Sequence, residues 1–186
     1  MTARIAPMEP PYAEEVDDQL RSMMPEGVPP IGLFRTFVKN MPMARAMRGW
    51  GGYELSRELS VSLRDREIVI DRTCARCGCE YEWGVHVVFF ADRAGLSEEQ
   101  VSSLTHGSAV DACWEAERDR VLVRLVDALH DTSSLPDELW AMVQAEFTEA
   151  EILDLTMLCG WYHVISFAAR AARVGLEEGA PRFSSV

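Results

Sequence analysis

The sequence predicts an all-α protein, and three observations lead to that prediction. No segment alternates apolar and polar residues over several positions between turn signals, which is the pattern of strands. Two stretches of capping-box type, Ser97-Glu-Glu-Gln100 and Thr148-Glu-Ala-Glu151, mark helix starts. Apolar residues recur at helical spacing, most clearly at Val121, Leu122, Leu125, Val126 and Leu129. We therefore expect seven or eight helices, in one domain that covers the 186 residues.

The first third of the chain predicts short helices between proline-rich stretches. Residues 1–11, which contain Pro7, Pro10 and Pro11, should form an extended arm. A short helix is predicted over about 12–24, followed by a second extended stretch that Pro29 and Pro30 impose. Apolar residues over 33–47 have helical spacing, with a predicted break near Pro42. Glycines 49, 51 and 52 are expected to interrupt this helical region.

The middle of the chain predicts a helical hairpin. Ser62-Leu-Arg-Asp65 is a capped helix start, and the helix should run to Cys77, where Gly78 stops it. The next helix should open at about Cys79 and end at Gly95. Three further helices are predicted, the first after Ser97, the second around 121–129 and the third over 136–147.

A long apolar helix is predicted over 152–174, and it contains a weak internal repeat. The stretch from Glu151-Ile-Leu through Cys159-Gly160 to Val174-Gly175-Leu176 resembles the stretch from Glu67-Ile-Val through Cys77-Gly78 to Ala94-Gly95-Leu96. Both stretches pair a Cys-Gly step with a later Gly-Leu step. The repeat predicts that the chain holds two copies of one helical hairpin.

Charge and cysteine usage exclude several classes of partner. The formal net charge is -12, and no local basic cluster offsets it, so we expect neither nucleic-acid nor membrane binding. No run of about 18 apolar residues is present, and the first ten residues lack the apolar segment of an export signal. The odd number of cysteines, five, predicts reduced thiols and a cytoplasmic location.

Residues 66–86 gather the groups that can carry chemistry. On one predicted helix, Cys79, Glu82 and His86 stand at i, i+3 and i+7 and therefore share a face, with Trp83 as a neighbouring wall. On the preceding helix, Glu67, Asp71 and Cys74 share a face in the same way. A hairpin would bring Glu67 to His86, where a carboxylate fixes the tautomer and raises the basicity of the imidazole.

The thiols of this segment allow other interpretations. At a helix N-terminus, the Cys79 thiolate would be stabilised by the helix dipole. Cys74, Cys77, Cys79 and His86 could form a zinc site, but their spacing lacks the usual paired pattern. Cys74-Ala-Arg-Cys77 could be a redox pair, but it lacks the strand-to-helix context of such motifs. We therefore expect no metal and no cofactor.

These residues resemble the carboxymuconolactone decarboxylase and alkylhydroperoxidase D-like family. The resemblance rests on Asp65-Arg-Glu-Ile-Val-Ile, on Gly78-Cys-Glu-Tyr-Glu-Trp-Gly-Val-His86 and on Ala94-Gly-Leu-Ser-Glu-Glu-Gln-Val101, and it extends to Leu33-Phe-Arg-Thr36 and Glu151–Leu176. It implies an alkylhydroperoxidase D-like helical fold, assembly into homo-oligomers such as trimers or hexamers, and an active site near subunit contacts.

The resemblance also implies roles for individual residues. The peroxidase branch uses a glutamate, then two cysteines and a histidine on one helix, which correspond here to Glu67, Cys79 and His86, with Glu82 in place of the second cysteine. Glu82 cannot form a disulfide, so a peroxidase would need Cys77 or Cys74 as its resolving thiol. The decarboxylase branch resembles a cofactor-free acid–base site in which the histidine is the important group.

Three functions remain open at this point. The first is cofactor-free acid–base chemistry, of lyase or isomerase type, on a small carboxylated or carbonyl compound. His86 would transfer the proton, Glu67 would orient it and Glu82 would act as a second acid or base. The second is thiol-dependent hydroperoxide reduction at Cys79, and the third is non-catalytic binding of a small molecule. Residues expected around the substrate are Trp83, Tyr81 and Arg72, with Arg76 a further candidate for holding an anion.

Overall fold

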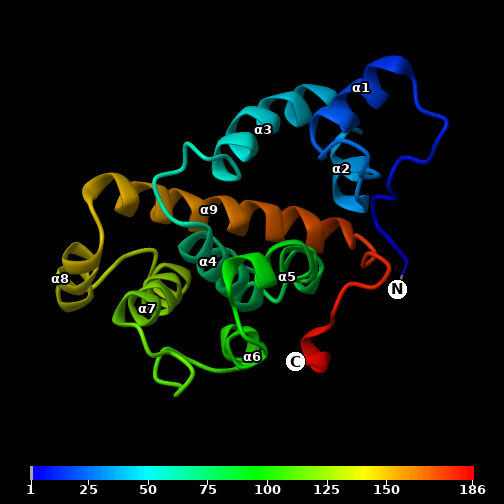
Figure 1. The fold of residues 1–186 in the computed structure, drawn as a ribbon. Coiled ribbons are helices and arrows are strands. Elements are labelled where there is room, and N and C mark those ends of the chain that lie inside the picture. Colours follow the sequence, from blue (N-terminus) through cyan, green and yellow to red (C-terminus); the bar gives the residue numbers. More distant parts are fainter. Residues whose placement is uncertain (1) are drawn as a thin grey trace. The chain divides into compact units, whose positions relative to one another are not determined.

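The computed structural model describes residues 2–186 and is all-helical, as the sequence predicts. Nine α-helices and one short 3-10 helix, and no strand, are found in the described part of the chain (Figure 1). Residues 2–13, which contain the proline-rich arm, form no helix. By contacts the chain divides into two compact units, one of residues 1–59 and 169–178 and the other of residues 60–168 and 179–186. The single domain expected from the sequence stays a prediction.

The first unit contains three short helices and the last turn of a fourth. They are α1 (Glu14–Ser22), α2 (Gly32–Phe37) and α3 (Met41–Glu54), and α3 packs against both α1 and α2. The predicted break near Pro42 separates α2 from α3, because the Asn40 side chain caps α3 and accepts a hydrogen bond from the Met43 amide. This separation raises the number of helices above the seven or eight expected. The glycines after it do not end α3, which continues through Gly52 to Glu54.

The second unit holds the predicted hairpin and the helices around it. It contains α4 (Leu63–Arg76), α5 (Glu80–Ala94), α6 (Glu98–His106), α7 (Glu117–Thr132), α8 (Asp137–Glu146) and most of α9 (Glu149–Ala172). Helix α4 packs against α5, α6 and α7 (Figure 1). Its residues from Asp65 to Cys74 are all buried, so α4 is the central helix of this unit.

Local signals in the sequence define the ends of the hairpin. Ser62 and Asp65 form the predicted capping box, in which each side chain accepts a hydrogen bond from the backbone amide of the other. The chain turns at Gly78, whose φ of 63° is left-handed, and the Cys79 amide then donates to the Cys74 carbonyl at 2.8 Å. Helix α5 ends at Gly95, also left-handed at φ 66°. The turn at Gly78 lays α5 back against α4.

The second copy of the hairpin expected from the internal repeat is absent from the described residues. Gly160 corresponds to Gly78 in the repeat, but it lies inside the single long helix α9. Gly160 is not among the residues with positive φ, whereas Gly78 is. The repeat therefore reflects similar apolar helices, and only its first copy turns back on itself.

Helix α9 is the one helix of the described chain that is long and apolar enough to cross a membrane by length and composition alone. Within its most apolar window, 44% of the residues are buried inside the protein. A buried core helix passes the same test of length and hydropathy. The Cys159, Tyr162 and Ser166 side chains of α9 are buried, and each contacts a side chain of α4 or α5. We interpret α9 as a core helix.

Candidate active site

The hairpin joins Glu67 of α4 to His86 of α5, as the sequence predicts. The Glu67 Oε2 atom lies 2.8 Å from His86 Nδ1. Both side chains are buried, with relative exposures of 0% for Glu67 and 3% for His86. An ionised carboxylate can only accept a hydrogen bond, so Nδ1 carries a proton and donates it to Glu67. This contact fixes the orientation of the ring and turns Nε2 towards the opposite side.

Two further groups lie beside His86 Nε2. The hydroxyl of Tyr162, on α9, is 3.0 Å from this nitrogen, and the two rings meet edge to face with centroids 5.0 Å apart. Glu82, four residues before His86 on α5, has its Oε1 atom 3.7 Å from the same nitrogen. The hydroxyl is close enough for a hydrogen bond, whereas the carboxyl is beyond ordinary hydrogen-bond distance. Nε2 is therefore the point at which a phenol, an imidazole and a carboxyl meet.

Arg66 holds the other oxygen of Glu67. Its Nε atom lies 2.7 Å and its NH2 atom 2.6 Å from Glu67 Oε1, and the guanidinium is almost fully buried. The same guanidinium lies 4.9 Å from the centroid of the Phe90 ring, and the Phe90 ring is 5.3 Å from that of His86. Arg66, Glu67, His86 and Tyr162 thus form one chain of polar contacts that starts at a cation and ends at a phenol.

The surroundings of His86 act on its pKa in opposite directions. Burial lowers the pKa of the imidazole, because it disfavours the charged form. The charge and hydrogen bond of Glu67 raise it, and the carboxyls of Glu82 and Asp71 add to that effect. The acidic neighbours outweigh burial, so the pKa of His86 lies above its ordinary value of 6.5. An imidazole tuned in this way takes up a proton readily near neutral pH.

Two buried carboxyls next to this chain have raised pKa values, which favours their neutral form. Burial, followed by the charge of Glu67, raises the pKa of Asp71 well above its ordinary value of 3.8. Burial also raises the pKa of Glu82, with Glu67 adding to the effect and His86 opposing it. Both oxygens of Asp71 and the Oε2 atom of Glu82 have no hydrogen-bond partner among the described residues. Glu82 therefore combines a raised pKa with an unpartnered oxygen beside the His86 ring.

The Cys79 thiol does not have the thiolate character predicted for a helix N-terminus. Cys79 caps α5 as expected, but its relative exposure is only 1%. Burial raises the pKa of the thiol to about 11, although a backbone hydrogen bond at Glu82 acts in the opposite direction. Desolvation is thus stronger here than the helix dipole. At neutral pH the thiol is protonated, which makes it a weak nucleophile.

The two expected resolving thiols have different surroundings. Cys74 is fully buried, and burial together with the nearby Cys79 raises its pKa well above the ordinary 9.0. Cys77 lies at the end of α4, near His130 and His163. None of the five cysteines, all of them within the described residues, forms a disulfide. Cys74 is therefore the thiol more closely associated with Cys79 and the His86 site.

The arginines expected to hold a substrate anion have other partners. Arg72 forms a two-pronged ion pair with Asp127 of α7, at 2.8 and 2.9 Å, and also donates to the carbonyls of Leu104 and Gly107. Arg76 pairs with Asp127 and Asp131. These contacts join α4 to α7. The hydrogen-bond donors of both arginines therefore stabilise the packing of the two helices. The arginine that touches Glu67 is Arg66, which was not among the predicted site residues.

The predicted aromatic wall is also buried. Trp83 has no exposed surface and packs edge to face against Phe183 of the C-terminal 3-10 helix, with centroids 5.0 Å apart. Tyr81 is 4% exposed. Tyr162, which contacts His86, was not predicted as a site residue, because a tyrosine inside an apolar helix has the pattern of a core residue. The clearest signal for it was its place in a segment with Cys159 and His163.

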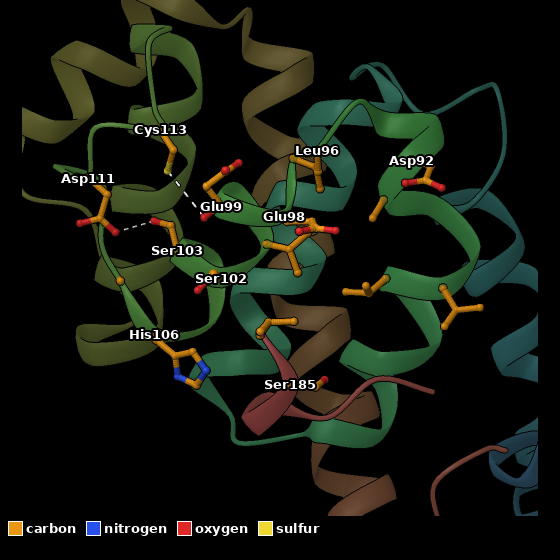
Figure 2. A pocket seen from close by; sticks show the side chains of 16 residues that line it. Asp92, Leu96, Glu98, Glu99, Ser102, Ser103, His106, Asp111, Cys113 and Ser185 are labelled. Atoms are coloured by element: carbon orange, nitrogen blue, oxygen red, sulfur yellow. Dashed lines mark hydrogen bonds between the residues drawn. The ribbon is translucent and has the colours of Figure 1, made fainter. Parts of the chain in front are cut away.

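A surface groove of the second unit lies away from His86. It has a volume of about 1040 Å³ and lies along α5 and α6, with the C-terminal residues Ser185 and Val186 at one end (Figure 2). Acidic and small polar side chains line much of it, and the close-up shows Asp111 bonded to Ser103 and Cys113 near Glu99. None of Glu67, Cys79, Glu82 and His86 lines this groove. The acid–base groups that contact one another therefore belong to the buried cluster and not to this groove.

A comparison with protein families confirms the resemblance. Residues 42–124 match the sequence model of the Carboxymuconolactone decarboxylase family. The match covers the hairpin and thus includes Glu67, Cys79, Glu82 and His86. No protein with a curated description matches the chain.

Solved structures share the fold. An uncharacterised peroxidase-related protein from Silicibacter sp. TM1040 is 15% identical, with a TM-score of 0.80 over 95% of this chain and 93% of its own. A protein of unknown function from Agrobacterium tumefaciens, described as a candidate AhpD antioxidant defence protein, is 22% identical, with a TM-score of 0.67 over 76% of this chain and 95% of its own. A cysteine-to-alanine variant of the debrominase Bmp8, in complex with 2,3,4-tribromopyrrole, is 14% identical, with a TM-score of 0.74 over 96% and 94%. At these identities the likeness establishes the alkylhydroperoxidase D-like fold.

Proposed function

We propose, from the carboxymuconolactone decarboxylase family match and the geometry of the buried cluster, that this protein is a cofactor-free acid–base enzyme. Its reaction would be of lyase or isomerase type, on a small carboxylated or carbonyl compound. The observation that carries the proposal is the continuous chain from Glu67 through His86 to Tyr162, with contacts of 2.8 and 3.0 Å. Such a chain moves a proton without a metal or an organic cofactor.

Each group in the chain has a separate task. Glu67 accepts a hydrogen bond from Nδ1–H of His86 and stabilises the imidazolium that forms when Nε2 takes a proton from the substrate. Arg66 holds the Glu67 carboxylate in place through its two contacts with Oε1. The Tyr162 phenol carries a proton, and burial raises its pKa well above the ordinary 10.0, so it is one candidate proton donor to the reaction intermediate. Burial also raises the pKa of Glu82, which favours its protonated form and makes it the second candidate donor. The proposed enzyme thus has one base, His86, and two candidate acids, Tyr162 and Glu82, which both lie beside its Nε2 atom.

The surroundings of the chain favour a small anionic substrate. The site is buried, so the substrate must fit where water is largely excluded. Arg66 is the cation that contacts the cluster, and its guanidinium lies on the Phe90 ring, which is only partly buried. A carboxylate that enters beside Phe90 would have the Arg66 guanidinium as its cationic contact. The buried cation is therefore the feature of the site that favours a carboxylated compound.

A second candidate function is thiol-dependent reduction of a hydroperoxide. The observation in its favour is the proximity of Cys74 and Cys79 to the same cluster, since the Cys79 amide donates to the Cys74 carbonyl at 2.8 Å. In this reaction the Cys79 thiol would reduce the peroxide to an alcohol and become a sulfenic acid. Cys74 would then form a disulfide with it and release water, and an external dithiol would restore both thiols. The high pKa of Cys79 makes this the second choice.

The experiment that separates the two functions screens classes of compound rather than one natural substrate. Small carboxylated lactones, oxo acids and other carbonyl compounds are incubated with the protein in D₂O, and hydrogen exchange, isomerisation and decarboxylation are followed by NMR. In parallel, hydroperoxide consumption is measured with a dithiol as reductant. The variants are His86→Ala, Tyr162→Phe and Cys79→Ser, and Cys113→Ser, whose thiol is outside the cluster, is the control.

The two functions predict different effects of these substitutions. For a proton-transfer enzyme, His86→Ala abolishes activity on the carbonyl compound, and Cys79→Ser and Cys113→Ser retain it. If the protein instead consumes hydroperoxide, loses that activity in Cys79→Ser and forms a Cys74–Cys79 disulfide by mass spectrometry, the acid–base proposal is wrong.

We also propose that the protein forms homo-oligomers, trimers or hexamers by the family resemblance. The support in the structure is a set of exposed apolar side chains on α9, namely Leu153, Met157, Val164 and Phe167. Light scattering after size-exclusion chromatography measures the mass directly. A monomer at micromolar concentration would contradict this proposal.

A further inference from the structure

A second cluster of potential ligands lies in the same unit of the protein and is separate from the Glu67–His86 pair. It consists of Cys77, at the C-terminal cap of α4, His130, in the last turn of α7, and His163, in the middle of α9. One ligand atom from each residue lies within 4.8 Å of the other two. Three different helices therefore bring a thiol and two imidazoles to one point.

The contacts of His163 direct one of its nitrogens into this cluster. Its Nδ1 atom lies 2.8 Å from the backbone carbonyl of Cys159, one turn earlier in α9. A carbonyl only accepts hydrogen bonds, so the ring proton is on Nδ1 and the lone pair is on Nε2. The Nε2 atom lies 3.0 Å from His130 Nδ1. An imidazole that donates one ring N–H to a carbonyl and turns its other nitrogen to a neighbouring ligand has the arrangement usual at metal sites.

We propose that Cys77, His130 and His163 bind a zinc ion. Zinc accepts thiolate and imidazole ligands in a tetrahedron, with Zn–S near ~2.3 Å and Zn–N near ~2.0–2.1 Å, so its ligand atoms stand about 3.3–3.8 Å apart. The observed atoms, all within 4.8 Å of each other, reach that spacing with shifts of about 1 Å. Three protein ligands leave a fourth position for water or another ligand.

The position of the cluster suits an ion that comes from solvent. Cys77 is buried, whereas His130 and His163 are each partly exposed, so the metal would reach the thiol past the two imidazoles. The charged side chains that act on His130 are Arg76, Asp131 and Asp127, and Arg76 pairs with Asp127 at 3.6 Å and with Asp131 at 2.5 Å. These pairs neutralise the guanidinium, and the overall charge of -12 favours a cation.

This site differs from the zinc set considered from the sequence. That set joined Cys74, Cys77, Cys79 and His86, but both nitrogens of His86 contact groups outside that set, Glu67 and Tyr162. The Nε2 atom of His163, by contrast, faces His130, which belongs to the cluster. Only Cys77 belongs to both sets. His130 and His163 lie 53 and 86 residues from Cys77 in the chain, so no local spacing motif could reveal the cluster.

Cobalt(II) is the probe that tests the proposal, because it occupies zinc sites and its spectrum reports the ligands. The reduced full-length protein is freed of metal with a chelator and titrated with Co²⁺ without oxygen. We expect one equivalent per chain, a thiolate-to-cobalt charge-transfer band, and displacement of the cobalt by Zn²⁺. Cys77→Ser should lose the charge-transfer band, and His163→Gln should weaken binding and change the visible bands.

Matched controls separate this site from the other thiols and histidines. Cys79→Ser, Cys113→Ser and His106→Gln should all retain the band, and circular dichroism of the metal-free variants shows whether each is folded. If Cys77→Ser does not fold, His163→Gln and His130→Gln test the same cluster through the imidazoles. The proposal is overturned if the wild-type spectrum has no thiolate band, or if the band depends on Cys79 and survives in Cys77→Ser.

Discussion

His86 and His163 have the same hydrogen-bond pattern but different partners. In each ring Nδ1 is anchored by an oxygen, and Nε2 lies 3.0 Å from a second functional group. The anchor of His86 is the Glu67 carboxylate, and that of His163 is the Cys159 carbonyl. A carboxylate stabilises the imidazolium, whereas a neutral carbonyl only fixes the tautomer. The anion makes His86 suitable for carrying protons, and the neutral anchor leaves the Nε2 lone pair of His163 available to a metal.

Burial separates the two sites further. The His86 site is closed, with Glu67 at 0% and Tyr162 at 2% exposure, and its carboxyls Asp71 and Glu82 have raised pKa values. The His130–His163 pair is partly exposed, so water competes for its polar atoms. We therefore expect the loss of the buried charge at the first site to cost much more stability than a substitution at the second. Substitutions of Glu67, Tyr162, Asp71 and His163 test this difference, in decreasing order of expected effect.

Glu67→Gln should have the largest effect. It removes the negative charge that pairs with Arg66 and leaves that guanidinium buried with a neutral partner. Breaking a buried ion pair costs about 3–5 kcal/mol in the free energy of unfolding, which urea denaturation measures. The control is Glu117→Gln, whose partially exposed pair with Arg120 should be worth less than about 1 kcal/mol. Equal costs for the two variants would show that burial does not strengthen the dependence of stability on the Glu67–Arg66 pair.

Tyr162→Phe should have its main effect on catalysis. It removes the hydroxyl 3.0 Å from His86 Nε2 but keeps the ring that packs against the imidazole. Loss of one positioned acid–base group lowers kcat by about 100-fold, whereas stability should fall by only about 1 kcal/mol. The measurement is kcat on the compound found in the NMR screen, with Tyr12→Phe, a tyrosine in the N-terminal segment, as control. An unchanged kcat would remove Tyr162 from the mechanism.

The sequence predicted the core of the first site because its signals are local. Helical spacing, the Ser62–Asp65 capping box and the stop at Gly78 together place Glu67 opposite His86. Tyr162 and Arg66 could not be predicted in the same way. Tyr162 comes from α9, 76 residues beyond His86, and its packing depends on the tertiary fold. Arg66 is adjacent to Glu67 in sequence, and adjacent helical residues do not normally face one another.

Burial explains most of the remaining differences from the sequence. The helix dipole suggested a Cys79 thiolate, but desolvation, which only the packed structure reveals, keeps the thiol protonated. Arg72 was expected near a substrate, but its guanidinium forms an ion pair with Asp127, which lies 55 residues further along the chain. Gly160 has the same Cys-Gly context as Gly78 but remains helical, because a glycine permits a turn without requiring one. The cluster of Cys77, His130 and His163 could not be predicted either, because its residues come from three helices that only the folded structure brings together.

Stability should depend on pH through the first site. Raised pKa values of Asp71 and Glu82 mean that the folded state binds their protons more tightly than the unfolded state, whose values are near 3.8 and 4.5. The contribution of these two carboxyls to the free energy of unfolding is therefore fully present at low pH, and it is lost progressively as the pH rises above about 4. His86, also raised, adds a loss above its ordinary 6.5. Maximal stability should then lie on the acidic side of neutrality.

Asp71→Asn tests this dependence at one residue. It removes a titrating group whose oxygens have no hydrogen-bond partner among the described residues. The decline in stability with pH should become shallower by about 1.4 kcal/mol per pH unit within the titration range. Urea denaturation at a series of pH values measures the slopes, and Glu138→Gln, an exposed carboxyl in α8, should leave the slope unchanged. If Asp71→Asn has the slope of the wild type, Asp71 is ionised in the folded protein.

The smallest effect is expected for His163→Gln in metal-free protein. The contact between His130 and His163 is partly exposed, so water can replace it, and its loss should cost about 1 kcal/mol or less in the free energy of unfolding. Urea denaturation in the presence of a chelator measures this cost. When the measurement is repeated with zinc, the wild type should gain stability and His163→Gln should not, because an ion stabilises the state that binds it. A large cost without metal would mean that the pair is a core contact as essential to folding as Glu67 and His86.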